Sequence, residues 1–432
     1  MLKKNSYNIA VVGLGNIGNY FINFLIKNKK IICDKTNSNI NKIYISAKNR
    51  NKKRKLPINK KIIWLNNYKE IFNNEDIDIV VELIGNSEGP AKDLVFSSLS
   101  KKKHVITANK ALIAKHGNLL SKIAEKNKVN LEYEAAVCGG VPIIRSIKEG
   151  LLANKIDRIF GILNGTSNYI LSSMLKQNLS FNSILDIAKN KGYAESNPLS
   201  DLNGDDVASK LKILTALAFN CKINQSIQVE GIKDIDLEDI KIADSLGYKI
   251  KLLGIAEKIE NKIFQRVYPA LIQKSSYIAS IDGVLNAVII DGKPVGRSVI
   301  QGEGAGPDAT TSALISDLSS VLRGNIKFPF SIADNNRKIL NFEKISKLQF
   351  SAYIKLQVKD KKGVLSNITK DFSDSKVSIK RLIQNPVKTK KHSSIVIITH
   401  KCRNDYLEKT IKKLSNKKYI VKKPKLIRID NT

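Results

Sequence analysis

Short hydrophobic runs alternate with amphipathic stretches along the first third of the chain. The pattern predicts strands in "NIAVVGLG", "NKIYISA", "DIDIVVELIG" and "HVITANK", and a helix over Asn16–Lys29 directly after the first of them. A further strand and a glycine turn are expected in "VNLEYEAAVCGGVPII", from Val129 to Ile144. Strands that alternate with helices are typical of crossover units and a parallel sheet. Residues 1–145 are therefore expected to form an α/β domain.

The helix expected after "HVITANK" has an apparent end in the sequence. His116 is followed by Gly117, and glycine is common just beyond a helix C-terminus. A histidine in the last turn also offsets the helix dipole. We therefore expect the helix to end at His116.

The pattern changes beyond residue 145. Residues 146–301 contain strand-like runs, "RIFGILNGT" and "NAVIIDG" among them, and a long helix is expected over Asp205–Asn220. Val207, Leu211 and Leu214 recur in it at helical spacing. The mixture predicts a second domain of the α+β class.

A polar linker at residues 336–348 precedes the last segment, residues 349–432. Strands are expected there in "AYIKLQV", "VSIKRLIQ", "SSIVIITH" and "VKKPKLIRI", and helices in "VLSNITKDFSDS" and "DYLEKTIKKLSN". This β-α-β-β-α-β order is that of a ferredoxin-like module.

The composition is strongly basic, with a formal net charge of +34. The cations are spread along the whole chain, and the densest run, Lys48–Lys61, lacks the interleaved aromatic residues on which bases stack. We therefore expect a solvated basic surface and no nucleic-acid partner. No apolar run reaches the roughly 20 residues of a membrane span, so no membrane association is expected.

Four cysteines, Cys33, Cys138, Cys221 and Cys402, stand singly, without a CxxC pair or the spacing of zinc ligands. This arrangement favours reduced thiols in the cytoplasm over a disulfide framework or a metal cluster. Cys138 has no neighbouring histidine, so we expect a small buried residue there rather than a nucleophile.

The glycine-rich segment "VVGLGNIG" follows a predicted strand and opens a predicted helix. Gly13 permits a tight turn, Gly15 lets a pyrophosphate approach the backbone, and Gly18 lets helix and strand pack closely. In this strand-turn-helix context the motif predicts dinucleotide binding. Asn16 and Ile17, which lie between the last two glycines, are expected to contact the cofactor as well.

The end of the next strand indicates which dinucleotide is bound. An acidic residue there would hold the ribose hydroxyls of NAD(H), but this chain has Lys48 and Arg50 instead. Cations suit a 2′-phosphate, so the prediction is NADP(H), with NAD(H) as the alternative.

Acidic residues gather in "GYAESNPLSDLNGDDVASK", at the start of the long helix in the second domain. Asp206 and Lys210 are four residues apart and therefore face the same side of that helix. Such a pair is often a minor surface ion pair. Here Pro198 stiffens the loop ahead of the helix, and Gly204 allows a tight turn into it. Carboxylates that hold an ammonium group, beside a lysine that transfers a proton, would suit a redox enzyme acting on an amino acid.

The stretch Ala188–Lys210 resembles the signature segment of homoserine dehydrogenases. In the family's order, "VGLGNIG" resembles the cofactor loop, "TANKAL" the lysine segment near the nicotinamide, and "YEAAVCGGVPII" the turn into the substrate domain. "GILNGTSNYIL" and "GEGAG" are similar as well. The resemblance implies a Rossmann-type NADP-binding domain at residues 1–145, completed by a returning segment at about 302–335. It also implies a catalytic and dimerisation domain at residues 146–301.

The resemblance implies roles for individual residues. Lys210 matches the catalytic proton donor and acceptor, while Asp206, Glu195 and Asp201 match carboxylates of the substrate pocket. Lys110 matches a lysine that contacts both cofactor and substrate. Glycines at the nicotinamide end of the cofactor are matched by Gly192 and Gly306. A sodium site built largely from backbone carbonyls is matched by Glu134, Val137, Gly139 and Val141.

The implied reaction is the interconversion of L-aspartate 4-semialdehyde and L-homoserine, a step in the biosynthesis of threonine, methionine and isoleucine. NADPH would give hydride to C4 of the semialdehyde, and Lys210 would protonate the resulting alkoxide. The implied assembly is a homodimer or homotetramer.

Residues 349–432 resemble an ACT domain, a module that binds amino acids in biosynthetic enzymes. Many such modules carry Asp-x-Pro-Gly at the first turn, and Lys362 stands in the proline position here. Threonine, the end product of the pathway, is the implied effector.

Two other hypotheses stay open on the sequence: another NADP-dependent dehydrogenase or reductase of an amino-acid semialdehyde, and a non-catalytic regulator or nucleic-acid-binding protein. A phosphorylating semialdehyde dehydrogenase would need a nucleophilic cysteine with a base, and none is evident. A pure regulator would not need Glu195, Asp206 and Lys210 in this arrangement. No kinase-like segment precedes the cofactor domain, so we expect no fused aspartate kinase.

Overall fold

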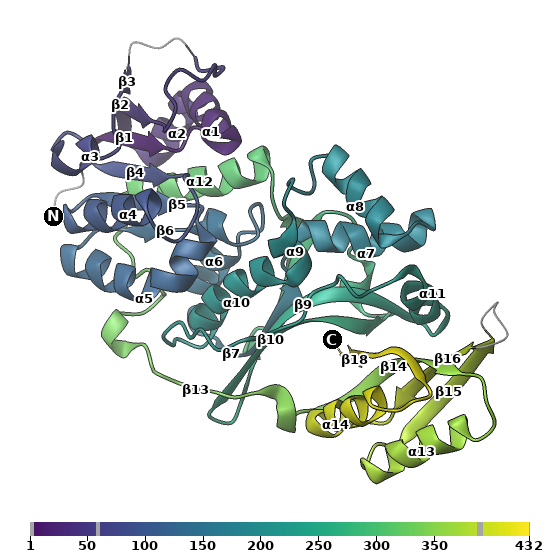
Figure 1. The fold of residues 1–432 in the computed structure, drawn as a ribbon. Helices are drawn as coiled ribbons and strands as arrows, with labels where there is room; N and C mark the ends of the chain where they lie inside the picture. Colours follow the sequence, from purple (N-terminus) through teal and green to yellow (C-terminus); the bar gives the residue numbers. More distant parts are fainter. Residues whose placement is uncertain (1–3, 58–60, 387–391, 432) are drawn as a thin grey trace.

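Two β-sheets organise the chain in the computed structural model, which describes residues 4–57, 61–386 and 392–431 (Figure 1). One is a parallel sheet of six strands near the N-terminus, and the other is a mixed sheet of twelve strands. The basic run Lys48–Lys61 includes residues 58–60, which lie outside the described ranges.

The six-stranded sheet has the strand order of a dinucleotide-binding domain. Its strands, in spatial order, are β3 (Ile62–Trp64), β2 (Asn39–Ser46), β1 (Ser6–Val12), β4 (Ile79–Glu82), β5 (His104–Thr107) and β6 (Leu131–Glu132). Every neighbouring pair is parallel. The order 3-2-1-4-5-6 is that of the doubly wound Rossmann fold, so the predicted fold class is confirmed.

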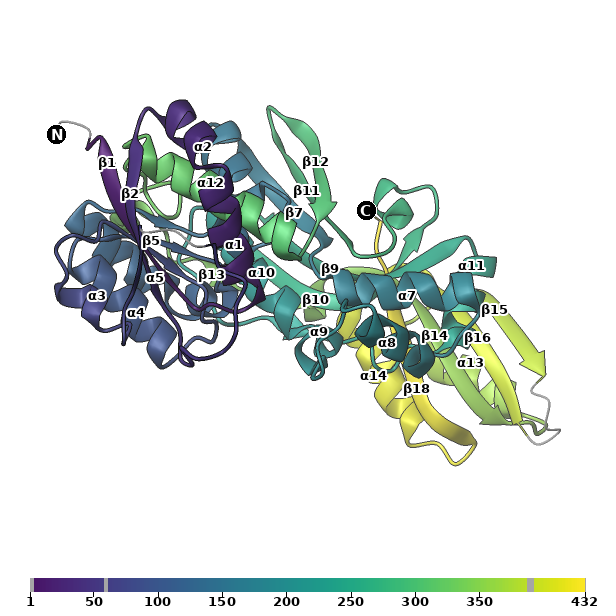
Figure 2. The ribbon, with the colours of Figure 1, turned by 90° about the horizontal axis from the view of Figure 1, so that it is seen from above.

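Helices cover both faces of this sheet. Ile9 and Val11 of β1 face one layer of helices, whereas Ala10 and Val12 face the other. The first layer consists of α1 (Asn16–Lys27), α2 (Lys29–Thr36) and α12 (Pro307–Leu322). The second consists of α3 (Glu70–Asn73), α4 (Pro90–Ser100) and α5 (Lys110–Asn127). The late helix α12 thus lies beside α1, as Figure 2 shows.

The prediction that a helix ends at His116 was wrong. α5 continues to Asn127, so both His116 and Gly117 lie in its interior. A Cβ at Gly117 would come within 2.8 Å of the Ile223 side chain and 3.0 Å of the Phe330 ring. Glycine is therefore present for close packing between segments and not for a turn.

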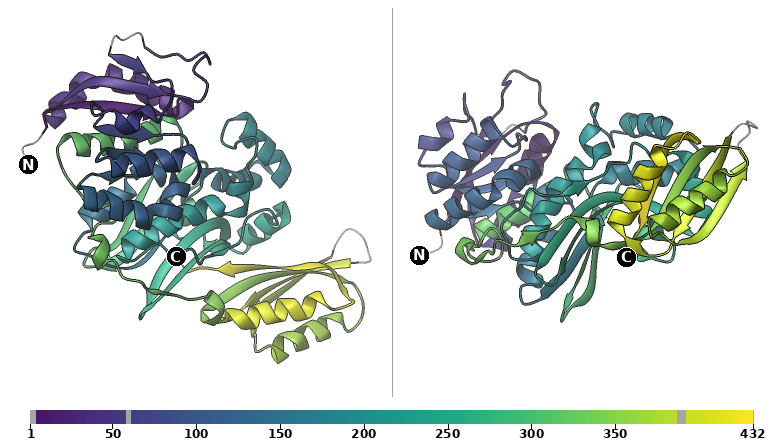
Figure 3. Two further views of the ribbon diagram at one scale, coloured as in Figure 1. Left: turned by 60° about the vertical axis from the view of Figure 1, so that its left-hand side comes forward. Right: turned by 60° about the horizontal axis from the view of Figure 1, so that its bottom comes forward.

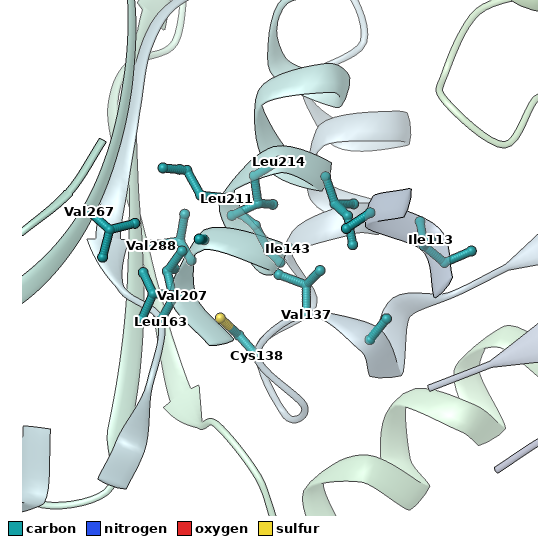
Figure 4. Close-up of a cluster of buried hydrophobic side chains, with 14 of the residues drawn as sticks. Ile113, Val137, Cys138, Ile143, Leu163, Val207, Leu211, Leu214, Val267 and Val288 are labelled. Carbon is teal, nitrogen blue, oxygen red and sulfur yellow. The ribbon is translucent and has the colours of Figure 1, made fainter. Parts of the chain in front are cut away.

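The five long strands that residues 155–303 contribute to the twelve-stranded sheet are antiparallel, and helices cover one face of them. They are β7 (Lys155–Ile162), β9 (Tyr248–Ile259), β10 (Lys262–Gln273), β11 (Leu285–Lys293) and β12 (Gly296–Glu303). Helices or short segments associated with them are α6 (Ile143–Arg145), α7 (Gly165–Gln177), α8 (Phe181–Asn190), α9 (Leu199–Asn203), α10 (Asp205–Ala218) and α11 (Leu237–Ser245). Helix α10 packs its apolar side against this sheet and the loop before α6. That cluster, drawn in Figure 4, includes Val137, Cys138, Ile143, Leu163, Val207, Leu211, Leu214, Val267 and Val288.

The last segment folds as the β-α-β-β-α-β pattern predicts. Its main elements are β14 (Gln349–Lys359), α13 (Val364–Asp374), β15 (Ile379–Pro386), β16 (His392–Thr399), α14 (Asn404–Ser415) and β18 (Ile420–Ile429). The strands are antiparallel, in the order β18-β14-β16-β15. Both helices pack on one face of the sheet, and the linker reaches it along the surface of the molecule (Figure 3).

The end of β18 joins the two domains into one sheet. Arg428 and Ile429 pair in parallel with Ala270 and Leu271 of β10. Two shorter strands, β8 (Gln228–Val229) and β13 (Asn341–Phe342), pair with other parts of β10, and β17 (Cys402–Arg403) pairs with β14. The sequence pattern did not predict this junction.

Charged side chains are buried where the domains meet. The Arg428 guanidinium donates to both carboxylate oxygens of Glu230, at 2.9 and 3.0 Å, and to Asn404 Oδ1 at 2.8 Å. Two residues further along, Asp430 accepts from Arg158 at 2.8 Å. The junction is therefore polar as well as hydrogen-bonded through the backbone.

Within the part of the chain that the structure describes, no helix is long and apolar enough to cross a bilayer.

We predict that Arg428→Met lowers the free energy of unfolding by about 2 kcal/mol. Removing one partner of a fully buried ion pair destabilises a protein by about 3–5 kcal/mol. The effect should be smaller here, because the Glu230 side chain is 35% exposed and water can solvate its charge. Arg297→Met is the matched control, because the Arg297 side chain is 51% exposed and its pair with Asp291 should contribute about 1 kcal/mol at most. Urea unfolding measures both, and equal losses would contradict the prediction.

Candidate active site

Lys210 and Asp206 form a buried ion pair at the start of α10. The Lys210 Nζ lies 2.9 Å from Asp206 Oδ2 and also donates to the Leu163 carbonyl at 2.6 Å. Lys210 is 8% exposed and Asp206 is 5% exposed. The alternative of a minor surface ion pair is therefore excluded.

A second lysine reaches the same carboxylate from the other domain. Lys110 is the first residue of α5, and its Nζ lies 3.0 Å from Asp206 Oδ1. Each oxygen of Asp206 thus faces one lysine. The Lys110 side chain is 40% exposed, so it can still meet a ligand between the domains.

Asp201 lies next to this pair and shares a hydrogen-bond donor with it. Asn164 donates through Nδ2 to Asp201 Oδ1 and to Asp206 Oδ2, both at 2.9 Å. Sequence reasoning missed Asn164. The only available signal was its place in "LNGTSN", where a polar residue before a helix suits an N-cap.

Glu195 and Gly192 lie on the loop between α8 and α9. The Thr166 hydroxyl donates to the Tyr193 carbonyl at 2.6 Å, and the rings of Tyr169 and Tyr193 are 5.0 Å apart, so the loop is tied to α7. Gly192 has φ +74° and open space where a Cβ would stand. Glu195 is exposed, and across residues 4–57, 61–386 and 392–431 no lysine or arginine forms an ion pair with it.

The charges of the cluster depend on one another. Burial would raise the pKa of Asp206, but Lys210 and Lys110 outweigh it and hold this pKa well below its usual range. Burial would lower the pKa of Lys210, but Asp206 outweighs it and raises this pKa. For Asp201, burial and the Asp206 charge raise the pKa. The site therefore holds a charged lysine–carboxylate pair beside a carboxyl group that is harder to ionise.

The glycines after β1 form a cradle open to a cavity of about 670 Å³. Gly13 has φ +101°, and a Cβ there would lie 2.4 Å from the Leu83 backbone. A Cβ on Gly18 would lie 2.2 Å from the Gly13 carbonyl, whereas Gly15 faces open space. The loop therefore fits a dinucleotide phosphate at the start of α1, whose first residues are Asn16 and Ile17.

Cations also line this cavity. Lys48, Lys52 and Arg54 are among its lining residues, and Arg54 also donates to the Leu14 carbonyl at 3.1 Å. Arg50 instead donates to Asn66 Oδ1 at 2.7 Å and lies over the Trp64 ring. Sequence reasoning missed Lys52 and Arg54, although both stand in the basic run that it noted.

The glycine loop before α12 lies against the loop before α6. The Gly140 N–H donates to the Glu303 carbonyl at 2.9 Å, and a Cβ on Gly139 would lie 2.9 Å from the Gly304 carbonyl. Gly306 has φ +113° and open space at its Cβ position. The structure thus brings the two segments together.

The residues matched to a sodium site lie in one short segment, from Glu134 to Val141. The Glu134 carboxylate accepts from the Ile144 and Arg145 N–H groups, both at 2.8 Å. Gly139 and Val141 lie in a turn closed by a 2.8 Å hydrogen bond from the Val141 N–H to the Cys138 carbonyl, and the Val137 N–H donates to the Glu134 carbonyl at 3.2 Å. Among the described residues, no three His, Cys, Asp or Glu side chains gather to hold a metal ion.

Three family models match the chain in sequence. The NAD-binding domain of homoserine dehydrogenase matches residues 13–134, homoserine dehydrogenase matches residues 142–319, and the ACT domain matches residues 352–417. A homoserine dehydrogenase of Helicobacter pylori is 36% identical over 429 residues, covering 99% of this chain and 100% of that protein. One of Neisseria gonorrhoeae is 38% identical over 375 residues, covering 84% and 85%.

The chain belongs to the homoserine dehydrogenase family.

Solved homoserine dehydrogenases have the same architecture. The structure from Thiobacillus denitrificans has a TM-score of 0.91 at 35% identity and covers 99% of both chains. A structure from S. aureus at pH 7.5 has a TM-score of 0.76 at 32% identity, covering 99% of this chain and 100% of that one. The protein is thus a homoserine dehydrogenase, an oxidoreductase, with a C-terminal ACT domain, and the non-catalytic hypothesis is wrong.

For this homoserine dehydrogenase we predict that Asp206→Asn lowers the free energy of unfolding by about 3 kcal/mol at pH 7, because Lys210 then stays buried without its counter-charge. Asp206 has a depressed pKa when folded, so its contribution is fully present above its unfolded pKa of about 3.9. This stabilisation by Asp206 is lost as the pH falls from the unfolded pKa through the lower pKa of the folded state. Urea unfolding should show the same difference in free energy of unfolding between the unaltered enzyme and Asp206→Asn from pH 4 to pH 7. That difference should become smaller only below pH 4.

Proposed function

We propose that the enzyme interconverts L-aspartate 4-semialdehyde and L-homoserine with NADP(H), and that Lys210 donates and accepts the proton. The step would serve the biosynthesis of threonine, methionine and isoleucine. The observation that carries the proposal is the buried Lys210–Asp206 pair, which Lys110 of the cofactor domain also reaches.

The chain's own residues would hold and move the proton. Because Asp206 raises the pKa of Lys210, that lysine is protonated at neutral pH, which supports donation to a substrate alkoxide. NADPH, with its phosphates in the cradle of Gly13 and Gly15, would supply the hydride from its reduced nicotinamide. In the opposite direction Lys210 must first lose its proton, so homoserine oxidation should become faster as the pH rises.

Carboxylates would hold the amino group of the substrate. Glu195 is exposed on its loop and Asp201 is partly exposed beside Asn164, so both can meet an ammonium group. Asp206 is occupied by two lysines, which supports a role in orienting Lys210 and Lys110. Gly192 and Gly306, with open space at their Cβ positions, would leave room at the nicotinamide end.

We also propose that Glu134, Val137, Gly139 and Val141 hold a sodium ion through oxygen atoms, which suits a hard cation. The surrounding groups support it, since the buried Asp317 carboxylate accepts from the Glu134 N–H at 2.9 Å and brings a second acidic group to this turn. A bound cation would offset this excess of negative charge. Replacing NaCl by choline chloride tests the proposal through the melting temperature.

The ACT domain supports an amino-acid effector, and we propose threonine, although Lys362 occupies the usual proline position. Because β18 of the ACT domain pairs with β10 of the catalytic domain, a change in the ACT domain on binding threonine could reach the catalytic domain through this shared sheet. Calorimetric titration of the full chain with threonine tests this. We also propose that the enzyme is a homodimer or homotetramer. The four cysteines are all free thiols, which supports a location in the reducing cytoplasm.

We predict that Lys210→Met lowers kcat by about 10²- to 10⁴-fold, the usual contribution of a general acid–base group, while the Kd for NADPH changes little. Lys212→Met is the control, because Lys212 lies two residues further on the same helix and bonds Gln225 instead. Absorbance at the NADPH band measures turnover, and fluorescence titration measures cofactor binding. Normal turnover by Lys210→Met would refute the assigned role.

We predict that Lys48→Met raises the KM for NADPH about tenfold and leaves the KM for NADH nearly unchanged, because Lys48 lines the cavity beside Lys52 and Arg54. Arg50→Met provides the comparison, since Arg50 faces Trp64 and Asn66. Steady-state kinetics with both cofactors decides which cation contacts the 2′-phosphate. Equal KM values for the two cofactors in the unaltered enzyme would favour the NAD(H) alternative.

A further inference from the structure

Asn164 lies between β7 and α7, at the centre of the polar cluster. It is 5% exposed and is the N-cap of α7, where its Oδ1 accepts from the Ser167 N–H at 2.8 Å. An N-cap needs only this one acceptor. The side chain has a second polar group, and the cap does not use it.

That second group, the amide nitrogen, bridges two carboxylates. Nδ2 donates to Asp201 Oδ1 and to Asp206 Oδ2 at the same distance of 2.9 Å. Both of its hydrogens are thereby used, so the Asn164 side chain makes three hydrogen bonds. Asp206 Oδ2 is also the oxygen that faces Lys210.

The residue before Asn164 contacts the lysine of the same pair. The Leu163 carbonyl accepts from Lys210 Nζ at 2.6 Å. Of these two consecutive residues, Leu163 therefore contacts the lysine of the ion pair and Asn164 contacts its carboxylate. The backbone here has little freedom, because a Cβ on Gly165 would lie 2.6 Å from the Val284 carbonyl. The residues that follow β7 are therefore held in one conformation, and their polar groups contact α9 and α10.

A bridging amide also has an electrostatic consequence. Asp201 and Asp206 carry like charges and come from two different helices, α9 and α10. Two such groups would repel each other in a buried setting unless donors lie between them. A neutral amide supplies these donors without adding a third charge, and serine at the same position could cap the helix but has only one hydrogen to donate.

We propose that Asn164 is a positioning residue for the dehydrogenase reaction, which fixes Asp201 toward the substrate amino group while Asp206 holds Lys210. The inference rests on the proposed function, because it takes Asp201 as a substrate-binding group and Lys210 as the proton carrier. Asn164 itself contacts neither the cofactor cradle nor either lysine, so it acts through the two carboxylates.

Asn164→Ser tests the positioning role, because serine keeps the cap and loses the bridge. We expect kcat/KM for homoserine to fall about 10- to 100-fold, in line with the loss of hydrogen bonds to charged groups. The KM for NADP should stay within about twofold. The melting temperature should fall, because two carboxylates lose a donor, but the enzyme should stay folded because serine keeps the N-cap.

The pH profile separates positioning from a purely structural role. The Asn164 hydrogen bond lowers the pKa of Asp201 against the larger effect of burial, so its loss raises that pKa. Asp201 must be ionised to hold an ammonium group, and the acidic limb of kcat/KM for homoserine should therefore move to higher pH. Asn164→Asp keeps the shape and the cap but places a third carboxylate there, so it should lose more activity and show a larger shift.

The result that would overturn the proposal is a folded Asn164→Ser enzyme whose acidic limb stays where it is, whether or not its rate falls. Failure of both variants to fold would also overturn it, since the role would then be structural. Lys210→Met and Asp206→Asn are assayed alongside. If these two keep full activity, the proposed function fails; if they lose activity while Asn164→Ser does not, only the inference about Asn164 fails.

Discussion

The structure depends on an ion pair that is almost wholly removed from water. Taking a lysine and a carboxylate out of water costs several kcal/mol for each ion, and their attraction offsets this only when further hydrogen bonds complete the pair. Around Lys210 and Asp206 these bonds come from the Leu163 carbonyl, the Asn164 amide and Lys110. The end of β7 and the start of α5 must therefore meet the first turns of α10, which places the candidate active site where the two domains touch.

Much of the fold could be predicted because its signals are local. Strand and helix periods placed all six main elements of the ACT domain, and β1, α1 and α10 as well, within a few residues. The glycines at 13, 15 and 18 act through the backbone of their own turn, so the motif alone indicated the cradle. Lys210 and Asp206 are four residues apart on one helix, and their pairing needed only helix geometry.

The rest depends on contacts between distant segments, which a single sequence does not show. Asn164 resembles any helix cap until α9 and α10 bring two carboxylates against its amide. Gly117 looks like a helix end, and only Ile223 and Phe330 show that space is the constraint. Arg54 could not be separated from the other cations of its run, because the fold alone decides which of them face the cavity.

Three separate strands pair with one edge of β10, each along a different part of it. β13 pairs with its first residues, β8 with its middle and the end of β18 with its last, and these three segments come from remote parts of the chain. A protein cut off before β14 would leave Ala270 and Leu271 with unpaired peptide groups next to apolar side chains. Open edges of this kind recruit strands from other molecules, so we expect a protein without the ACT domain to aggregate more readily than the full chain.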